Sequence, residues 1–133
     1  MKKCLLIAII RFMLAGFNSC GNNVNEKERQ DFFKSQVELL NETCPIEFGD
    51  FMTMEKAIAM PNYTIKICST LDLDPELCAN IDKDLAKQGA ISGLKMDPGF
   101  DLIKKYELSY LYEYRNADGQ FLYDLLITPE DYK

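Results

Sequence analysis

The chain has 133 residues, a formal net charge of −6 at neutral pH, and neither histidine nor tryptophan. The chain lacks the commonest general base and metal ligand. Catalytic sites of the Ser-His-Asp and Cys-His types and histidine-based zinc sites are therefore excluded, because each of them contains a histidine. The length allows one compact domain, and the acidity gives no electrostatic basis for binding nucleic acid. We therefore expect a non-enzymatic domain without a cofactor or a metal. A carboxylate enzyme such as a glycosidase stays open as an alternative, since the separation of two carboxyl groups depends on the fold.

The first twenty residues, MKKCLLIAIIRFMLAGFNSC, have the features of an export signal. Lys2 and Lys3 give it a positive start, and the apolar run that follows is too short to span a bilayer, which takes about 20 apolar residues. Residues 17–20, Phe-Asn-Ser-Cys, resemble the lipobox of bacterial lipoproteins, in which a small residue precedes an acylated cysteine. The resemblance implies that residues 1–19 are a signal peptide and that Cys20 is the site of lipid attachment. Cleavage by an ordinary signal peptidase, giving a soluble secreted binding or inhibitor protein, is one alternative, and an unprocessed amphipathic tail is the other.

The residues that follow the signal suggest a short tether and a single domain. Residues 20–25 are predicted to be a lipidated amino terminus with a polar linker, and residues 26–133 a globular domain. Removal of residues 1–19 leaves 12 basic residues against 21 acidic ones, a formal charge of −9. Anionic headgroups would repel such a domain, so acyl chains such as palmitate on Cys20 would have to hold it at the membrane. We expect a lipoprotein of the cell envelope at the outer membrane, facing either the periplasm or the cell exterior, whose domain contacts an unknown envelope protein or ligand.

Residues 26–43 are predicted to form an amphipathic helix, because apolar side chains recur there at spacings of three and four residues. The helix is expected to end at Cys44-Pro45, since the helical conformation is disfavoured for a residue that precedes proline.

Residues 51–69 are predicted to form a β-hairpin with a turn at Pro61-Asn62. If Met60 lies opposite Tyr63, one face of the hairpin is apolar and the other mainly polar. The apolar face would then consist of Met52, Met54, Ile58, Met60, Tyr63, Ile65 and Ile67. A helix over residues 54–60 is the alternative, because these residues are strong helix formers.

Asp74-Pro75-Glu76 predicts the start of a central helix, with a capping carboxylate and proline at the first helical position. Its apolar stripe would be Leu77, Ile81 and Leu85, and Gly89 or Gly93 would end it. Asp97-Pro98 then predicts a shorter helix that carries Phe100 and Ile103.

Residues 107–127 are predicted to form a second hairpin around a turn at 116–119. Pairing Arg115 with Gln120 places Tyr114 opposite Phe121, Tyr112 opposite Tyr123, Tyr110 opposite Leu125 and Leu108 opposite Ile127. The resulting row of tyrosines could be an exposed platform for a glycan or peptide. We expect it to be core instead, because the amphipathic helices need an apolar partner.

The order of helix, two strands, helices and two strands predicts an α+β fold, in which an antiparallel sheet of two hairpins packs against the N-terminal helix and the central helical segment. The lipobox-like start, the helix ending in Cys44-Pro45 and the closing stretch Tyr112 to Tyr132 resemble the small uncharacterised lipoproteins of Bacteroidetes. Since no activity is assigned to that group, the resemblance implies an envelope location and a style of domain.

The cysteines that follow the signal are Cys44, Cys68 and Cys78. They form no C-x-x-C pair, which rules out a zinc ribbon or a thioredoxin-type motif. An oxidising envelope favours a disulfide, and a bond between Cys68 and Cys78 would close a loop of about ten residues, stabilising the fold by about 2–3 kcal/mol. Three free thiols are the alternative. Two acidic segments, residues 71–76 and 116–119, lack the ligand spacing of a calcium loop, so no metal site is expected.

Overall fold

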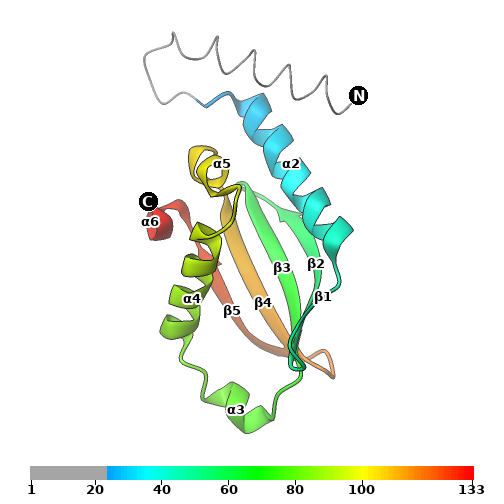
Figure 1. Cartoon of the computed structure of the whole chain (residues 1–133). Helices are drawn as coiled ribbons and strands as arrows, with labels where there is room; N and C mark the ends of the chain where they lie inside the picture. Colours follow the sequence, from blue (N-terminus) through cyan, green and yellow to red (C-terminus); the bar gives the residue numbers. More distant parts are fainter. Residues whose placement is uncertain (1–23) are drawn as a thin grey trace.

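A computed structural model describes residues 24–133 as a five-stranded sheet with its helices on one face (Figure 1). The elements are α2 (Glu26–Thr43), β1 (Ile46–Phe48), β2 (Met52–Met60), β3 (Thr64–Leu71), α3 (Pro75–Ala79), α4 (Lys83–Lys95), α5 (Phe100–Lys105), β4 (Ser109–Asn116), β5 (Phe121–Ile127) and α6 (Pro129–Tyr132). The predicted α+β class and order of elements are confirmed, with β1 as an additional short strand. The predicted signal peptide, the lipid site Cys20 and most of the tether lie outside the described residues.

The strands lie across the sheet in chain order, and β3 and β4 pair in parallel from Thr64↔Ser109 to Leu71↔Asn116. All other neighbours are antiparallel. The sheet is therefore mixed, and the expectation of a purely antiparallel sheet is wrong. The cause is the connection through α3, α4 and α5, which returns the chain to the end of the sheet where β3 begins, so that β4 starts beside it and runs the same way.

Helix α2 has the predicted bounds. The side chain of Asn25 caps its amino end by accepting hydrogen bonds from the backbone N–H groups of Lys27 and Glu28, at 2.9 and 3.4 Å. Cys44 is the C-cap residue of the helix, and Pro45 then leads into β1. Phe33 is the buried residue of the helix and joins the main core cluster.

The first predicted hairpin is present as β2 and β3, so the helical alternative for residues 54–60 is wrong. Its face assignment is also partly wrong, because the pairing shifts between Met54 and Lys56 and leaves Glu55 without a partner. An extra residue in one strand reverses the faces of all residues beyond it. Ala57 is therefore buried, whereas Ile58 is exposed. At the turn Met60 pairs with Thr64 instead of Tyr63.

The single central helix that the sequence suggested is two helices, α3 and α4. Asp82 starts the second one, because its carboxylate accepts hydrogen bonds from the N–H groups of Asp84 and Leu85 at 3.0 and 3.2 Å. The predicted stripe is consequently broken, and Leu77 and Leu85 are 60% and 66% exposed. Helix α4 continues through both glycines to Lys95 and buries Leu94. The predicted shorter helix, with Phe100 and Ile103, is confirmed as α5.

The second hairpin, β4 and β5, has a register different from the prediction. Tyr114 pairs with Tyr123, Tyr112 with Leu125 and Tyr110 with Ile127. The pairing then shifts to Arg115↔Phe121, which leaves Leu122 as an extra residue beside the turn. Because the pairing from Tyr123 onward differs from the expected one by two residues, the predicted faces of these residues are unchanged. The extra residue Leu122 reverses the face of Phe121, which pairs with Arg115 and is 53% exposed, so its predicted place in the core is wrong.

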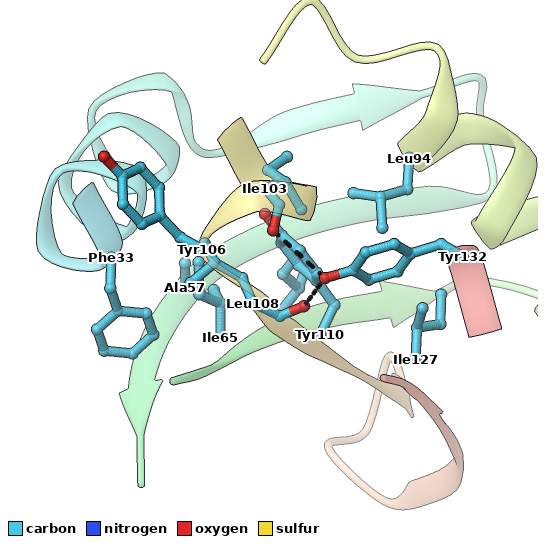
Figure 2. Packing of buried hydrophobic residues seen from close by; sticks show 11 residues of the cluster. Phe33, Ala57, Ile65, Leu94, Ile103, Tyr106, Leu108, Tyr110, Ile127 and Tyr132 are labelled. Atoms are coloured by element: carbon cyan, nitrogen blue, oxygen red, sulfur yellow. Dashed lines mark hydrogen bonds between the residues drawn. The ribbon is translucent and has the colours of Figure 1, made fainter. Parts of the chain in front are cut away.

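The main core lies between the helices and one face of the sheet, and Figure 2 shows its side chains. Tyr132 of α6 enters this core from the carboxyl end of the chain. Its hydroxyl lies 2.7 Å from the carbonyl oxygen of Leu108 and 3.3 Å from that of Ile103 (Figure 2). The last helix is thereby attached to the junction between α5 and β4.

Candidate functional site

The helices leave the second face of the sheet uncovered. Successive side chains of a strand point to opposite faces, so the neighbours of the core residues point away from the helices. We call this set the open face: Lys56, Ile58, Thr64, Lys66, Cys68, Thr70, Leu111, Glu113, Arg115, Asp124 and Leu126. None of these residues is buried. An uncovered sheet face that mixes charged and apolar side chains is a candidate binding surface.

Three charged residues form a cluster at the centre of the open face. Glu113 of β4 accepts hydrogen bonds from Lys66 Nζ at 2.7 Å and from Arg115 Nε at 2.8 Å. These bonds, first from Lys66 and then from Arg115, hold the pKa of Glu113 below its usual value, although burial acts in the opposite direction. The hydrogen bond to Glu113 likewise raises the pKa of Lys66. Arg115 also donates through Nη1 to the carbonyl oxygen of Gly119 at 3.0 Å, so the cluster ties β3 and β4 to the last turn.

A shallow groove of about 580 Å³ runs beside this cluster. It is lined by Glu55, Lys56, Ile58, Lys66, Cys68, Ser69, Thr70, Glu113 and Arg115. The lining has three cationic side chains against two carboxylates, whereas the domain as a whole has an excess of acidic residues. Lys66 and Arg115 are bound to Glu113, so the groove can receive polar groups of a ligand.

The described residues offer the open face no cluster that could hold a metal ion. Within 24–133 no group of three acidic or cysteine side chains could hold a metal ion. Cys68 lines the groove, and it has no histidine to activate its thiol because the chain contains none. The geometry supports binding through hydrogen bonds, ion pairs and apolar contacts.

The three cysteines of the described part of the chain are free thiols, and the disulfide considered between Cys68 and Cys78 is not formed. Cys68 lies on the open face, beside the groove. Cys78 lies in α3 near Tyr123, whose pKa is raised by burial and by this thiol. Tyr123 belongs to the core, so the two cysteines are on different sides of the sheet. Cys44 caps α2, and burial, followed by the charge of Glu55, raises its pKa.

The tyrosine row is part of the core, as expected. Tyr110 and Tyr123 are 4% and 7% exposed, and the ring of Tyr123 stacks on that of Tyr114 with 4.7 Å between centroids. Burial raises the pKa of Tyr112 and of Tyr114 to about 12. The half-buried members therefore stay neutral at physiological pH and act as packing residues.

No local sequence pattern indicates the charged cluster. Glu113 and Arg115 alternate with the tyrosines, so strand alternation alone places them on one face. Their partner Lys66 is distant in the sequence, and it becomes a neighbour only because β3 and β4 pair in parallel.

None of the helices in residues 24–133 has the length and hydropathy of a membrane-spanning segment.

The sequence matches no family model, and no curated protein is significantly similar to it. Solved structures nevertheless share its fold. EpsS, the pilotin of the type 2 secretion system of Vibrio vulnificus, has a TM-score of 0.65 at 17% identity, over 81% of this chain and 94% of the pilotin. AspS, the type II secretion pilotin of Vibrio cholerae, has a TM-score of 0.62 at 22% identity, over 79% of this chain and 93% of the pilotin. A candidate secreted protein of Pseudomonas aeruginosa has a TM-score of 0.68 at 6% identity, over 85% of this chain and all of that protein.

Proposed function

We propose that the chain is a non-enzymatic lipoprotein of the cell envelope whose domain binds a partner protein, as a component of a protein-secretion system. The observation that carries the proposal is the fold shared with two type II secretion pilotins, each matched over more than nine-tenths of its length. At 17% and 22% identity this likeness concerns the fold. The proposal therefore also depends on features of the chain itself.

The amino-terminal sequence supports membrane attachment. Residues 17–20 resemble a lipobox with Cys20 as the acylated residue, and α2 begins close behind it at Glu26. An acidic domain gains nothing from anionic headgroups, so attachment would depend on the acyl chains. In this proposal residues 1–19 are removed, and Cys20 becomes the anchored amino terminus at the outer membrane.

Two features of the domain favour a binding function over a catalytic one. Its sequence has no histidine, and its open face offers a mixed apolar and charged surface beside a groove. Such a surface suits a protein partner, because protein interfaces combine apolar contacts with hydrogen bonds and paired charges.

The anchor is tested by labelling cells with radioactive palmitate. The wild-type chain should incorporate the label and sediment with membranes, and Cys20→Ala should do neither. Cys44→Ala, which removes a cysteine from the folded domain, should behave like the wild type. Label retained by Cys20→Ala would show that the anchoring proposal is wrong.

The partner is tested by photo-cross-linking in the cell that produces the protein. A benzoylphenylalanine at Ile58 on the open face should cross-link to a secretion-system component. The same probe at Met96, which is 84% exposed on the helical side of the molecule, should not. Identical products from both positions would contradict a specific binding face.

A soluble secreted binding or inhibitor protein is the second candidate. It is favoured by the likeness to the candidate secreted protein of Pseudomonas aeruginosa. Intact mass separates the two proposals, because a lipidated amino terminus adds the mass of its acyl chains. A mature chain of unmodified mass in the medium would support secretion.

A further inference from the structure

One edge of the sheet is closed by short, local elements. β1 has three residues and pairs with Met52–Met54. Beyond it, Asn41 of α2 takes the place of a strand: its Nδ2 donates to the carbonyl oxygen of Ala57 at 2.8 Å, and its Oδ1 accepts from the Ala57 N–H at 2.9 Å. A side-chain amide thus satisfies the backbone where β1 stops, which leaves little of this edge free for another strand.

The opposite edge, β5, has no such cover. This strand pairs with β4, and within the described part of the chain its residues make no hydrogen bond on the outer side. Its sequence, FLYDLLI, contains no proline, lysine or arginine, and its protective features are the single charge of Asp124 and the extra residue Leu122 beside the turn. Helix α4 packs on the core face of the strand, and Leu126 on the open face is 48% exposed. A row of backbone donors and acceptors is therefore free to pair.

The charges around β5 select what can pair with it. Asp124 is exposed and lies opposite Glu113 across the β4–β5 pair. Glu113 is already held by Lys66 and Arg115, whereas Asp124 makes no ion pair in the described residues. A second copy of β5 running antiparallel about Asp124 would place two carboxylates side by side, which is destabilising. A strand with a cation at that position would complete the row of charges.

We propose that β5 is the docking edge for an extended segment of the partner protein, which adds an antiparallel sixth strand with lysine or arginine opposite Asp124 and an apolar residue opposite Leu126. Backbone hydrogen bonds give such a strand its affinity, and the alternate side chains give it selectivity. This inference deepens the proposed function and rests on it for the nature of the partner. It does not depend on the anchor at Cys20.

The test uses two fluorescein-labelled peptides and the full chain in dodecyl maltoside. The first peptide is acetyl-Thr-Val-Thr-Lys-Thr-Val-Thr-amide, and the second has glutamate in place of the central lysine. Fluorescence anisotropy should show the lysine peptide binding about threefold to tenfold more tightly than the glutamate peptide, because the charge pair opposite Asp124 changes from favourable to unfavourable. Asp124→Lys should reverse this preference. Asp118→Lys, the same change of charge in the exposed β4–β5 turn, should keep it.

Hydrogen exchange locates the binding. The lysine peptide should protect backbone amides of β5, and those of β2 should be unaffected. Equal binding of the two peptides, or an equal response to the variants at Asp118 and Asp124, would overturn the inference in favour of unspecific attraction. Protection of β5 by increasing protein concentration alone would overturn it in favour of a second copy. If the peptides do not bind as expected while Cys20 is still acylated, the docking edge at β5 is rejected and the proposed function stands. If the peptides bind as expected but Cys20 is not acylated, only the proposed membrane anchor is rejected.

Discussion

Replacement of Tyr132 by phenylalanine removes a single hydroxyl from the core and tests how the carboxyl end of the chain is held. The residue is 2% exposed, and its ring packs edge-on against Phe100 with 5.7 Å between centroids. Both features are kept in Tyr132→Phe. The variant loses the contacts of the hydroxyl with the carbonyl oxygens of Leu108 and Ile103, at 2.7 and 3.3 Å.

The two carbonyl groups are affected differently. Ile103 also accepts a hydrogen bond from the Leu108 N–H at 3.2 Å, so it keeps a partner. The carbonyl of Leu108 is buried, and it loses the Tyr132 hydroxyl, the shorter of the two contacts, as its hydrogen-bond partner. A lost hydrogen bond costs about 0.5–1.5 kcal/mol, and a buried group without a partner about 1–3 kcal/mol. We therefore expect Tyr132→Phe to lower the free energy of unfolding by about 1–2 kcal/mol and Tm by about 5–10 °C.

Urea unfolding followed by far-ultraviolet circular dichroism measures this difference. Tyr123→Phe is the control, because it removes a tyrosine hydroxyl from a ring that is 7% exposed. No buried side-chain oxygen among the described residues lacks a hydrogen-bond partner, so the Tyr123 hydroxyl, which makes no hydrogen bond within the described residues, reaches solvent. The control should change the free energy of unfolding by less than about 0.5 kcal/mol. Equal effects of the two substitutions would refute the attachment of α6 through the Tyr132 hydroxyl.

Three further predictions concern the edge of the sheet and the effect of pH. Asn41→Leu should lower the free energy of unfolding by about 1–3 kcal/mol in urea titration, because it leaves the N–H and C=O of Ala57 without their partners; unchanged stability would show that β1 alone closes that edge. The pKa values of Tyr112 and Tyr114 rise from 10.0 to about 12 on folding, so the stability they contribute is complete below pH 10 and is lost as pH rises towards 12. Tyrosinate absorbance should therefore appear together with unfolding, and ionisation of all tyrosines near their ordinary pKa with the fold intact would contradict this. Glu113→Gln should lower the free energy of unfolding at neutral pH by less than about 1 kcal/mol, because the ion pairs are partly exposed. Since folding lowers the pKa of Glu113, its contribution is present above about pH 4.5 and lost on acidification; a difference from the wild type that persists at about pH 2 would contradict the assignment.

Local chemistry made α2 predictable to the residue. The spacing of apolar residues located the helix, and Cys44-Pro45 prevents its continuation. Asn25 caps the amino end, which the sequence analysis did not identify. The same reasoning located α5 and the two hairpins. The prediction of one central helix was wrong at Asp82. This residue is a second cap inside an apparently continuous helical pattern, so a new helix starts there and Leu77 and Leu85 are exposed.

The pairing of strands that are distant in the sequence could not be predicted from local patterns, for physical reasons. Period-two patterns assign faces correctly only when no residue is inserted, and the bulge at Glu55 exchanged Ala57 for Ile58 in the core. The direction of β4 relative to β3 depends on where the helical connection returns, which no local pattern records. The charged cluster of the open face depends on that direction, because Lys66 meets Glu113 only in the parallel arrangement.

The parallel pairing at the centre of the sheet also determines the order in which the chain can fold. β3 contains Ile65 and Ile67, which are 0% and 3% exposed in the finished structure, yet its neighbour β4 is separated from it by the whole of α3, α4 and α5. Closing so long a connection costs entropy before the strand contacts can compensate. A chain that enters its compartment amino terminus first, as the proposed signal requires, therefore presents an uncovered apolar strand until Ser109 and the residues after it have arrived. If the proposed signal directs export, folding would be completed only at the end of translocation, and a chain truncated before β4 should aggregate.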